Sequence, residues 1–511
     1  MRILRPMQEG RLRPRGSLWV TVPWYPIAIV ATYAINLWVD SGVSVMAVMR
    51  SLVVAVVGAG LFLCLLLLIT RRLHVAGALT LIVILALLTR GLVYTLALLV
   101  LVVTATLAVR LWGRIRRRPI TWPQITTALN VVSALLLAVV LAGGLIRGTL
   151  PSVTTDIQQG RSTLHDSPEV DGLDRPSIYV LMLDGYPRAD SFTRLFGGNN
   201  NAFLAELRER GFVVAANSES NYMFTQLTLT SMFQMKPLSE IPALEPLADD
   251  ATTAHLLMRQ TLNDNPAFDI LRSQGYRIVT SSPGFEHVAL RQSDVYLDDG
   301  QLNEFEYQLL RFTTAQRIVN LVAPDFFADQ HRDRIRSNFR HYAEVAASDG
   351  GPTFAFIHVP APHLPVVFNE DGSDAYLPPS EDIFDWAEID SVTRERYVRQ
   401  LTYLNRRVSE LVDHTTAGHS SGPEPVIIVM SDHGAAPRPA VFIGEGTDDH
   451  YANLFAARTP GAAELFGNVV SPVNVFPRLF NAYFGMELEE WPNARYDWAA
   501  APKPTRFARL N

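Results

Sequence analysis

The chain has 511 residues, 48% of them hydrophobic, and its mean hydropathy of +0.13 is too high for an average soluble protein. Residues 1–150 hold 15 arginines and two acidic residues, a net charge of +13, so the remainder carries −19 of a total of −6. This asymmetry excludes one homogeneous globular domain, and the acidic remainder argues against nucleic acid as a partner because it would repel phosphate backbones. The only cysteine, Cys64, lies in an apolar run, which excludes a disulfide scaffold, a cysteine-based zinc finger and thiol catalysis in the polar part.

Five apolar segments fill the first 150 residues, and each is close to the ~20 residues needed to cross a bilayer. They are residues 18–39, 51–70, 73–89, 91–109 and 125–146. Because four more segments follow the first, a membrane anchor explains them better than a cleaved signal peptide does. We therefore predict that residues 1–150 form a five-helix anchor that crosses the cell (inner) membrane several times.

Arginine clusters set the orientation of this anchor. They lie before the first segment, between the second and third at Arg71 and Arg72, and between the fourth and fifth. With these loops in the cytoplasm, five crossings place residue 151 and everything after it outside. Only Arg90 separates the third and fourth segments; fusing them would reverse this result, but a helix over 73–109 would be far longer than a bilayer requires.

The rest of the chain is patterned as a soluble domain. Residues 151–176 are polar without apolar periodicity and are predicted to be a linker. From 177 to 511, short apolar runs alternate with helical segments, which predicts an α/β domain with a largely parallel sheet covered on both faces. The predicted strands are 177–183, 212–215, 277–280, 353–358 and 426–430, and the predicted helices include 201–210, 266–273, 334–347 and 394–412.

Candidate site residues follow two of these strands. In such sheets, sites form beyond the carboxyl ends of the strands, where this sequence places Asp184 and the pair Asp432-His433. Asp184 precedes a glycine and is also typical of an ordinary turn. A carboxylate next to a neutral imidazole is a good ligand pair for zinc or manganese.

A hydroxyl-rich segment, residues 221–233, lies between these two motifs, and we expect a helix to begin near Thr225. At a helix amino terminus, free N–H groups and the helix dipole favour an alkoxide or a bound anion. An N-cap role for the threonine is the structural alternative.

In this order, the motifs resemble the alkaline phosphatase superfamily, and within it the sulfatase-like branch of lipoteichoic acid synthases and phosphoethanolamine transferases. The resemblance covers nearly the whole chain, since those proteins also combine five membrane helices with an extracytoplasmic catalytic domain. It depends on the sequences Leu183-Asp184-Gly185, Asn221-Tyr222-x-x-Thr225, Ser231-Met232-Phe233, His358-x-x-x-x-His363 and Ser431-Asp432-His433-Gly434.

The resemblance implies an alkaline-phosphatase-like α/β/α sandwich and a site with one or two divalent ions, zinc or manganese. It implies that Thr225 is both nucleophile and metal ligand, and that His358 and His363 flank the reacting group. The implied metal ligands are Asp184, Thr225, Asp432, His433 and His450.

These residues fit a two-step transfer of phosphate through Thr225, because a bound cation stabilises an alkoxide and histidines move protons. The expected substrate is a lipid or glycan phosphoester of the cell envelope, and the acceptor is water or a hydroxyl. Two alternatives stay open: a sulfate-ester hydrolase that uses unmodified threonine, and a membrane-anchored family member without activity. Thr225 lacks the following proline and arginine that formylglycine sulfatases require, and the usual first acidic ligand of the transferases is Glu rather than Asp. The sequence leaves the oligomeric state open.

Overall fold

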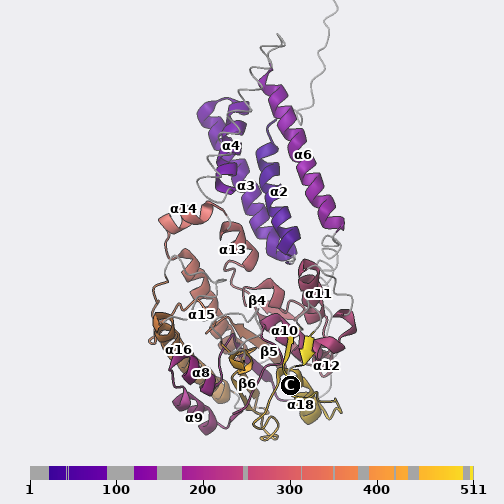
Figure 1. Cartoon of the computed structure of the whole chain (residues 1–511), viewed down its shortest axis with the longest axis vertical. Helices are drawn as coiled ribbons and strands as arrows, with labels where there is room; N and C mark the ends of the chain where they lie inside the picture. The colour runs from indigo at the N-terminus through magenta and orange to yellow at the C-terminus, as the bar shows by residue number, and fades with distance from the viewer. Residues whose placement is uncertain are drawn as a thin grey trace, which may run out of the picture. The chain divides into compact units, whose positions relative to one another are not determined.

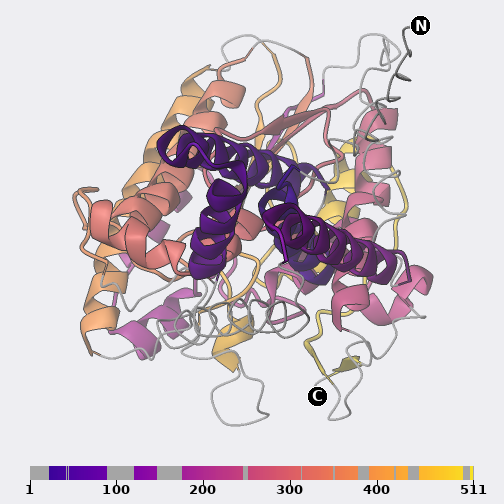
Figure 2. The ribbon, with the colours of Figure 1, turned by 90° about the horizontal axis from the view of Figure 1, so that it is seen from above.

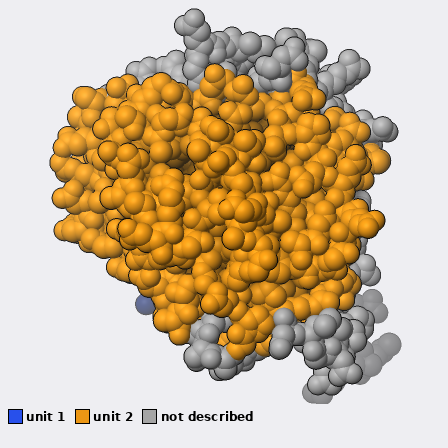
Figure 3. Space-filling model, turned by 90° about the horizontal axis from the view of Figure 1, so that it is seen from below, with its two compact units in different colours: residues 1–40, 48–151, 308–317 blue, residues 41–47, 152–307, 318–511 orange. Residues whose placement is uncertain are grey.

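The structure is a computed structural model with two compact units. The first comprises residues 1–40, 48–151 and 308–317, and the second comprises residues 41–47, 152–307 and 318–511. Figure 3 shows one face of the second unit, in orange. The description covers residues 22–41, 43, 45–88, 120–146, 175–244, 251–311, 313–348, 351–377, 391–418, 422–435, 448–498 and 507–509.

Apolar helices build the first unit. They are α2 (Tyr25–Ser41), α3 (Val45–Thr70), α4 (Leu73–Leu88) and α6 (Trp122–Ile146), with Val30, Ala59 and Ile84 in a shared apolar contact. Polar contacts also join them: Tyr25 N–H donates to Asn130 Oδ1 at 3.1 Å, and His74 Nδ1 lies 2.8 Å from Thr126 Oγ1. Polar contacts of this kind are typical of helices whose association is not driven by the hydrophobic effect.

The four described helices match the predicted segments 18–39, 51–70, 73–89 and 125–146, whereas 91–109 lies outside the described residues. Two of them, Val45–Thr70 and Trp122–Leu145, have the length and hydropathy of a membrane span. At 1.5 Å per residue, the 16 residues of α4 reach only about 24 Å, short of the ~30 Å hydrocarbon core. The five-helix anchor therefore stays a prediction, as does the linker, which lies almost entirely outside the described residues.

A seven-stranded sheet forms the centre of the second unit, in the order β2-β7-β6-β1-β5-β3-β4. Strands β6, β1, β5, β3 and β4 are parallel, while β7 runs antiparallel to both β6 and β2. The sheet is thus mixed but largely parallel, as predicted. Its strands are β1 (Ile178–Leu183), β2 (Val213–Val214), β3 (Arg277–Ser281), β4 (Val295–Leu297), β5 (Thr353–Val359), β6 (Val426–Met430) and β7 (Phe455–Arg458).

Helices cover both faces of this sheet (Figures 1 and 2). Alternate residues of β1 point to opposite faces: Leu181 joins one apolar core and Val180 the other, so a fully apolar strand is required. One face packs against α8 (Ala189–Phe196), α9 (Asn201–Glu209), α15 (Phe326–Ala346) and α16 (Ser391–Gly418). The other packs against α10 (Thr225–Gln234), α12 (Pro266–Ser273) and α18 (Val475–Phe484).

Shorter elements complete the described chain. They are α11 (Ala251–Asn263), α13 (Glu304–Arg311), α14 (Ala315–Val322), α17 (Asp448–Tyr451), the strand pair β8 (Tyr496–Trp498) and β9 (Phe507–Arg509), and the 3-10 turns η2 (Leu238–Glu240), η3 (Pro242–Leu244), η4 (Glu286–Val288) and η5 (Pro472–Asn474). Helices α13 and α14 lie where the sequence passes between the two units.

Candidate active site

Two neighbouring parallel strands deliver the predicted acids to one edge of the sheet. Asp184 is the first residue after β1, and Asp432 is the second residue after β6. Met182 of β1 and Met430 of β6 are in register. The Gly185 N–H donates to Asp432 Oδ1 at 3.0 Å and so joins the two strand ends. Gly185 has a φ of +69°, a conformation that side chains disfavour, so the turn between Asp184 and the neighbouring strand end requires glycine.

His433 completes a cluster with these two carboxylates. One potential ligand atom from each of Asp184, Asp432 and His433 lies within 4.8 Å of the others, and all three side chains are buried. His433 Nε2 is 3.2 Å from Asp432 Oδ2 and 3.7 Å from Asp184 Oδ1. His433 Nδ1 donates to the Gly434 carbonyl at 2.8 Å, which leaves the Nε2 lone pair of the neutral ring directed at the carboxylates.

Two buried carboxylate oxygens of this cluster accept no hydrogen bond: Asp184 Oδ1 and Asp432 Oδ2. An unsatisfied buried oxygen is costly, and a buried charge more so, unless a cation or donors neutralise it. Two carboxylates and one imidazole are a ligand set that zinc and manganese accept. The residues present therefore fit a divalent cation, with Asp184, Asp432 and His433 as its ligands.

The electrostatics of the cluster favour the ionised form of Asp184. Burial would raise the pKa of Asp184, but the neighbouring His363, His358 and His433 hold it below its usual range. Burial would lower the pKa of His433, but Asp432 and Asp184 raise it above its usual value. Binding of a cation to His433 therefore competes with protonation of its ring.

Thr225 stands beside this cluster at the first position of α10, where a helix start was expected. Its Oγ1 lies 3.4 Å from His433 Nε2. Leu229 and Phe233 bury the helix in the core, so the position of Thr225 is set by packing rather than by a mobile loop. Backbone N–H groups at the start of a helix favour an anion, and Thr225 lies at that end of α10.

The two predicted catalytic histidines lie at different places. His358, at the end of β5, is buried, and its Nε2 lies 3.3 Å from Asp184 Oδ2. This contact with the carboxylate is suited to orienting Asp184. His363 is half-buried beside Gly185; its N–H donates to the Asp184 carbonyl at 2.9 Å, and its Nδ1 donates to the Leu364 carbonyl at 2.7 Å.

His450, the remaining predicted ligand, is buried in α17. Its carbonyl accepts from the Gly434 N–H at 2.7 Å, so α17 is tied to the loop that carries His433. Its side chain is outside the three-residue set within 4.8 Å. The role of His450 as a metal ligand stays a prediction.

Asp449, directly before His450, is a buried acid. Only 5% of Asp449 is exposed, and its carboxylate accepts from Ser191 Oγ and pairs with Arg194 of α8. This contact joins α17 to α8.

His287, which fits no motif, also lies at this edge. Its carbonyl accepts a hydrogen bond at 3.1 Å from Nε2 of Gln226, the residue that follows Thr225. Its Nδ1 lies 3.1 Å from Glu304 Oε2. Burial would lower the pKa of His287, but Glu304 and the nearby Asp184 raise it above its usual value. Its partner is 17 residues away on another helix, which is why no local pattern in the sequence indicates it.

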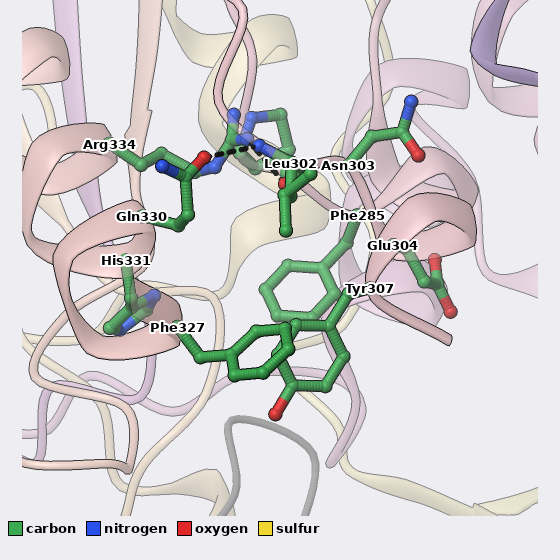
Figure 4. Close-up of a pocket in the computed structure, with 11 residues that line it drawn as sticks. Phe285, Leu302, Asn303, Glu304, Tyr307, Phe327, Gln330, His331 and Arg334 are labelled. Carbon is green, nitrogen blue, oxygen red and sulfur yellow. Dashed lines mark hydrogen bonds between the residues drawn. The ribbon is translucent and has the colours of Figure 1, made fainter. Parts of the chain in front are cut away.

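A small cavity of about 20 Å³ adjoins this pair (Figure 4). The rings of Phe285, Tyr307 and Phe327 lie together at its wall, with Tyr307 and Phe327 edge to face and their ring centroids 5.1 Å apart. His331 and Arg334 line it from α15. This volume holds about one water molecule. Burial, and then Arg334 and His363, lower the pKa of His331 to about 3, so its ring is neutral at ordinary pH.

No family model matches this sequence, and no curated protein sequence matches it either. Similar solved structures exist at low identity. The zinc complex of the periplasmic domain of EptC from Escherichia coli is 14% identical, with a TM-score of 0.40, over 66% of this chain and 93% of that one. The soluble domain of lipooligosaccharide phosphoethanolamine transferase A from Neisseria meningitidis is 11% identical, with a TM-score of 0.39, over 61% and 89%. Phosphonate monoester hydrolase from Agrobacterium radiobacter is 14% identical, with a TM-score of 0.39, over 64% and 82%. Another similar structure, from Vibrio parahaemolyticus, is of a protein in the alkaline phosphatase superfamily, the group that the sequence motifs resemble.

Proposed function

We propose that this chain is a membrane-anchored, metal-dependent enzyme that transfers or hydrolyses phosphate esters through Thr225. One observation carries the proposal: Thr225 Oγ1 lies 3.4 Å from His433 Nε2, which is itself next to two buried carboxylate oxygens without hydrogen bonds. A hydroxyl at such a place can become an alkoxide, whereas a free threonine at neutral pH cannot.

Asp184, Asp432 and His433 would hold a divalent cation, with Thr225 Oγ1 as a further ligand. When bound, the cation would supply charge that stabilises the alkoxide and the phosphoryl oxygens.

The residues of the chain do the rest. Thr225 Oγ attacks phosphorus, and the bond from phosphorus to the leaving oxygen breaks as the Thr225 Oγ–P bond forms. His363, half-buried at the edge of the cluster, gives its proton to the leaving oxygen. In the second step it takes the proton of a water molecule or hydroxyl, whose oxygen attacks phosphorus and releases Thr225. The N–H groups at the start of α10 stabilise the phosphoryl oxygens throughout.

The apolar helices support a substrate at the membrane. With Arg71 and Arg72 in the cytoplasm, the catalytic unit lies outside, close to lipid head groups and envelope glycans. We therefore assign a lipid or glycan phosphoester of the cell envelope as the substrate.

Mass spectrometry tests the nucleophile. After incubation with a phosphodiester and zinc or manganese, the full chain should carry phosphate on Thr225. Thr225→Ala should abolish both labelling and turnover, while Thr402→Ala, at an exposed position on α16, should keep both. Phosphate on another residue, or full turnover by Thr225→Ala, would contradict the proposal. Faster turnover of aryl sulfates than of aryl phosphodiesters would favour a sulfate-ester hydrolase instead.

A further inference from the structure

Helix α14 (Ala315–Val322) exposes an unusual amount of apolar surface. Ile318, Leu321 and Val322 are 48%, 83% and 78% exposed, and no residue of this helix is buried. Their spacing of three and four residues places them on one face of the helix, while Gln316, Arg317 and Asn320 lie on the other. Such an exposed apolar face in water is unfavourable and indicates a partner.

The chain places this helix at the end of an apolar one. The N–H of Thr314, directly before α14, donates to the carbonyl of Leu87 at 2.8 Å, one residue before α4 ends. Residues 308–317 belong to the same compact unit as the apolar helices, whereas the chain from 318 onward belongs to the catalytic unit. Because Arg71 and Arg72 precede the opposite end of α4, the Leu87 end is the one that faces outward.

We propose that α14 lies in the outer surface of the membrane, with Ile318, Leu321 and Val322 among the lipid chains. A short amphipathic helix of this kind buries its apolar face about 5–10 Å into the bilayer interface. Arg317, exposed on the polar side, is placed to reach lipid phosphates.

Fluorescence quenching tests the proposal without any assumption about activity. In a Cys64→Ser background, Leu321→Cys is labelled with an environment-sensitive dye, and the full chain is placed in phosphatidylglycerol–phosphatidylcholine nanodiscs. We expect a blue shift and strong quenching by lipids with a spin label near the head group. The matched control is Glu410→Cys on α16, whose side chain is 49% exposed and which should show neither effect.

Quenching at Leu321 no stronger than at Glu410 would overturn the proposal. A blue shift that depends on protein concentration instead of on lipid would assign the face to a second copy of the chain and would also overturn it. As a second check, a label at Ile318→Cys should lose its quenching in the Leu321→Glu/Val322→Glu variant. That variant should still fold, because neither side chain is packed in the protein interior.

Discussion

Replacing Asp432 with asparagine removes one of two buried carboxylates that face each other across the candidate metal site. Asp432 is fully buried; its Oδ1 accepts from the Gly185 N–H, a bond that the asparagine oxygen can keep. Its Oδ2 has no donor, and neither has Asp184 Oδ1. An asparagine N–H₂ group in place of Oδ2 would supply a donor where a second negative charge now lies.

The magnitude follows from the geometry. Two unit charges within 4.8 Å of one another repel by about 3 kcal/mol at an effective dielectric constant of about 20. A divalent ion present at about 100 times its Kd would add about 2.7 kcal/mol to the stability of the wild type. We therefore expect metal-free Asp432→Asn to melt at or above the metal-free wild type, and zinc to raise the melting temperature of the wild type alone.

The assay is thermal melting of the full chain in detergent at pH 8, after chelation and again after addition of zinc. Asp449→Asn is the matched control, because Asp449 is also buried but is paired with Arg194. It should lower the melting temperature and keep the response to zinc. A zinc response of Asp432→Asn equal to that of the wild type would refute the assignment of Asp432 as a ligand, and a much lower melting temperature of its metal-free form would refute the argument from repulsion.

Three further changes test the surroundings of the site by thermal melting. In Gly434→Ala, the new Cβ would lie 1.9 Å from the Asp449 carbonyl oxygen, so we expect a loss of about 1–3 kcal/mol or more; Gly461→Ala, where space is open, should lose less, even though its φ is +80°. Arg194→Gln leaves the buried carboxylate of Asp449 without its cation. Because 55% of the arginine side chain is exposed, we expect a loss of stability of about 1–2 kcal/mol rather than the roughly 3–5 kcal/mol of a fully buried pair. Addition of Asp449→Asn should restore part of this stability. The pKa of His331 is lowered to about 3, chiefly by burial. Between pH ~6.5 and ~3 the unfolded chain therefore binds more protons at this residue than the native chain does. The stability of the fold should fall as the pH is lowered through this range, by up to about 1.4 kcal/mol per pH unit. His331→Gln should flatten the change between pH 7.5 and 5; an unchanged slope would contradict the assignment.

The sheet was predictable where its strands are buried on both faces. Strands β1, β5 and β6 are continuous apolar runs, which water-exposed segments rarely are. The antiparallel strand β7 was missed because its four residues, Phe455–Arg458, include two alanines and no β-branched side chain. Strand β7 forms because it pairs with β6. Such pairing with a distant segment leaves no pattern in the sequence of β7 itself.

Helix α15 shows the same limit for buried charge. The sequence predicted a helix over 334–347, but it begins at Phe326. Its first turns contain Arg332, whose side chain is 3% exposed and donates to the carbonyls of Val367 and Ala375. In a sequence, a buried arginine cannot be told from a surface arginine. The apolar periodicity that predicts helices is therefore missing from the first turns of α15, where the buried side chains are polar.

The site divides in the same way. Asp184, Asp432 and His433 could be predicted because they follow apolar strands, and the ends of parallel strands meet at one edge. His287 and Asp449 could not be, because they are defined by Glu304 and Arg194, and Arg194 is 255 residues away from Asp449. Local sequence patterns therefore predict the site residues that follow strands of the sheet. They do not predict the residues whose positions depend on contacts with distant side chains.

Other buried acids of the catalytic unit show what distinguishes the cluster. Asp449 has Ser191 and Arg194, Glu286 has Arg291, and Glu306 accepts from the Asn303 N–H at 3.1 Å. Within the described ranges, the carboxylate oxygens that are buried without any donor are Asp184 Oδ1 and Asp432 Oδ2. A fold that satisfies its other buried acids, yet leaves these two open beside the hydroxyl of Thr225, holds a local instability that a divalent cation would relieve. Substitution of either acid should therefore affect metal binding and turnover before it affects folding.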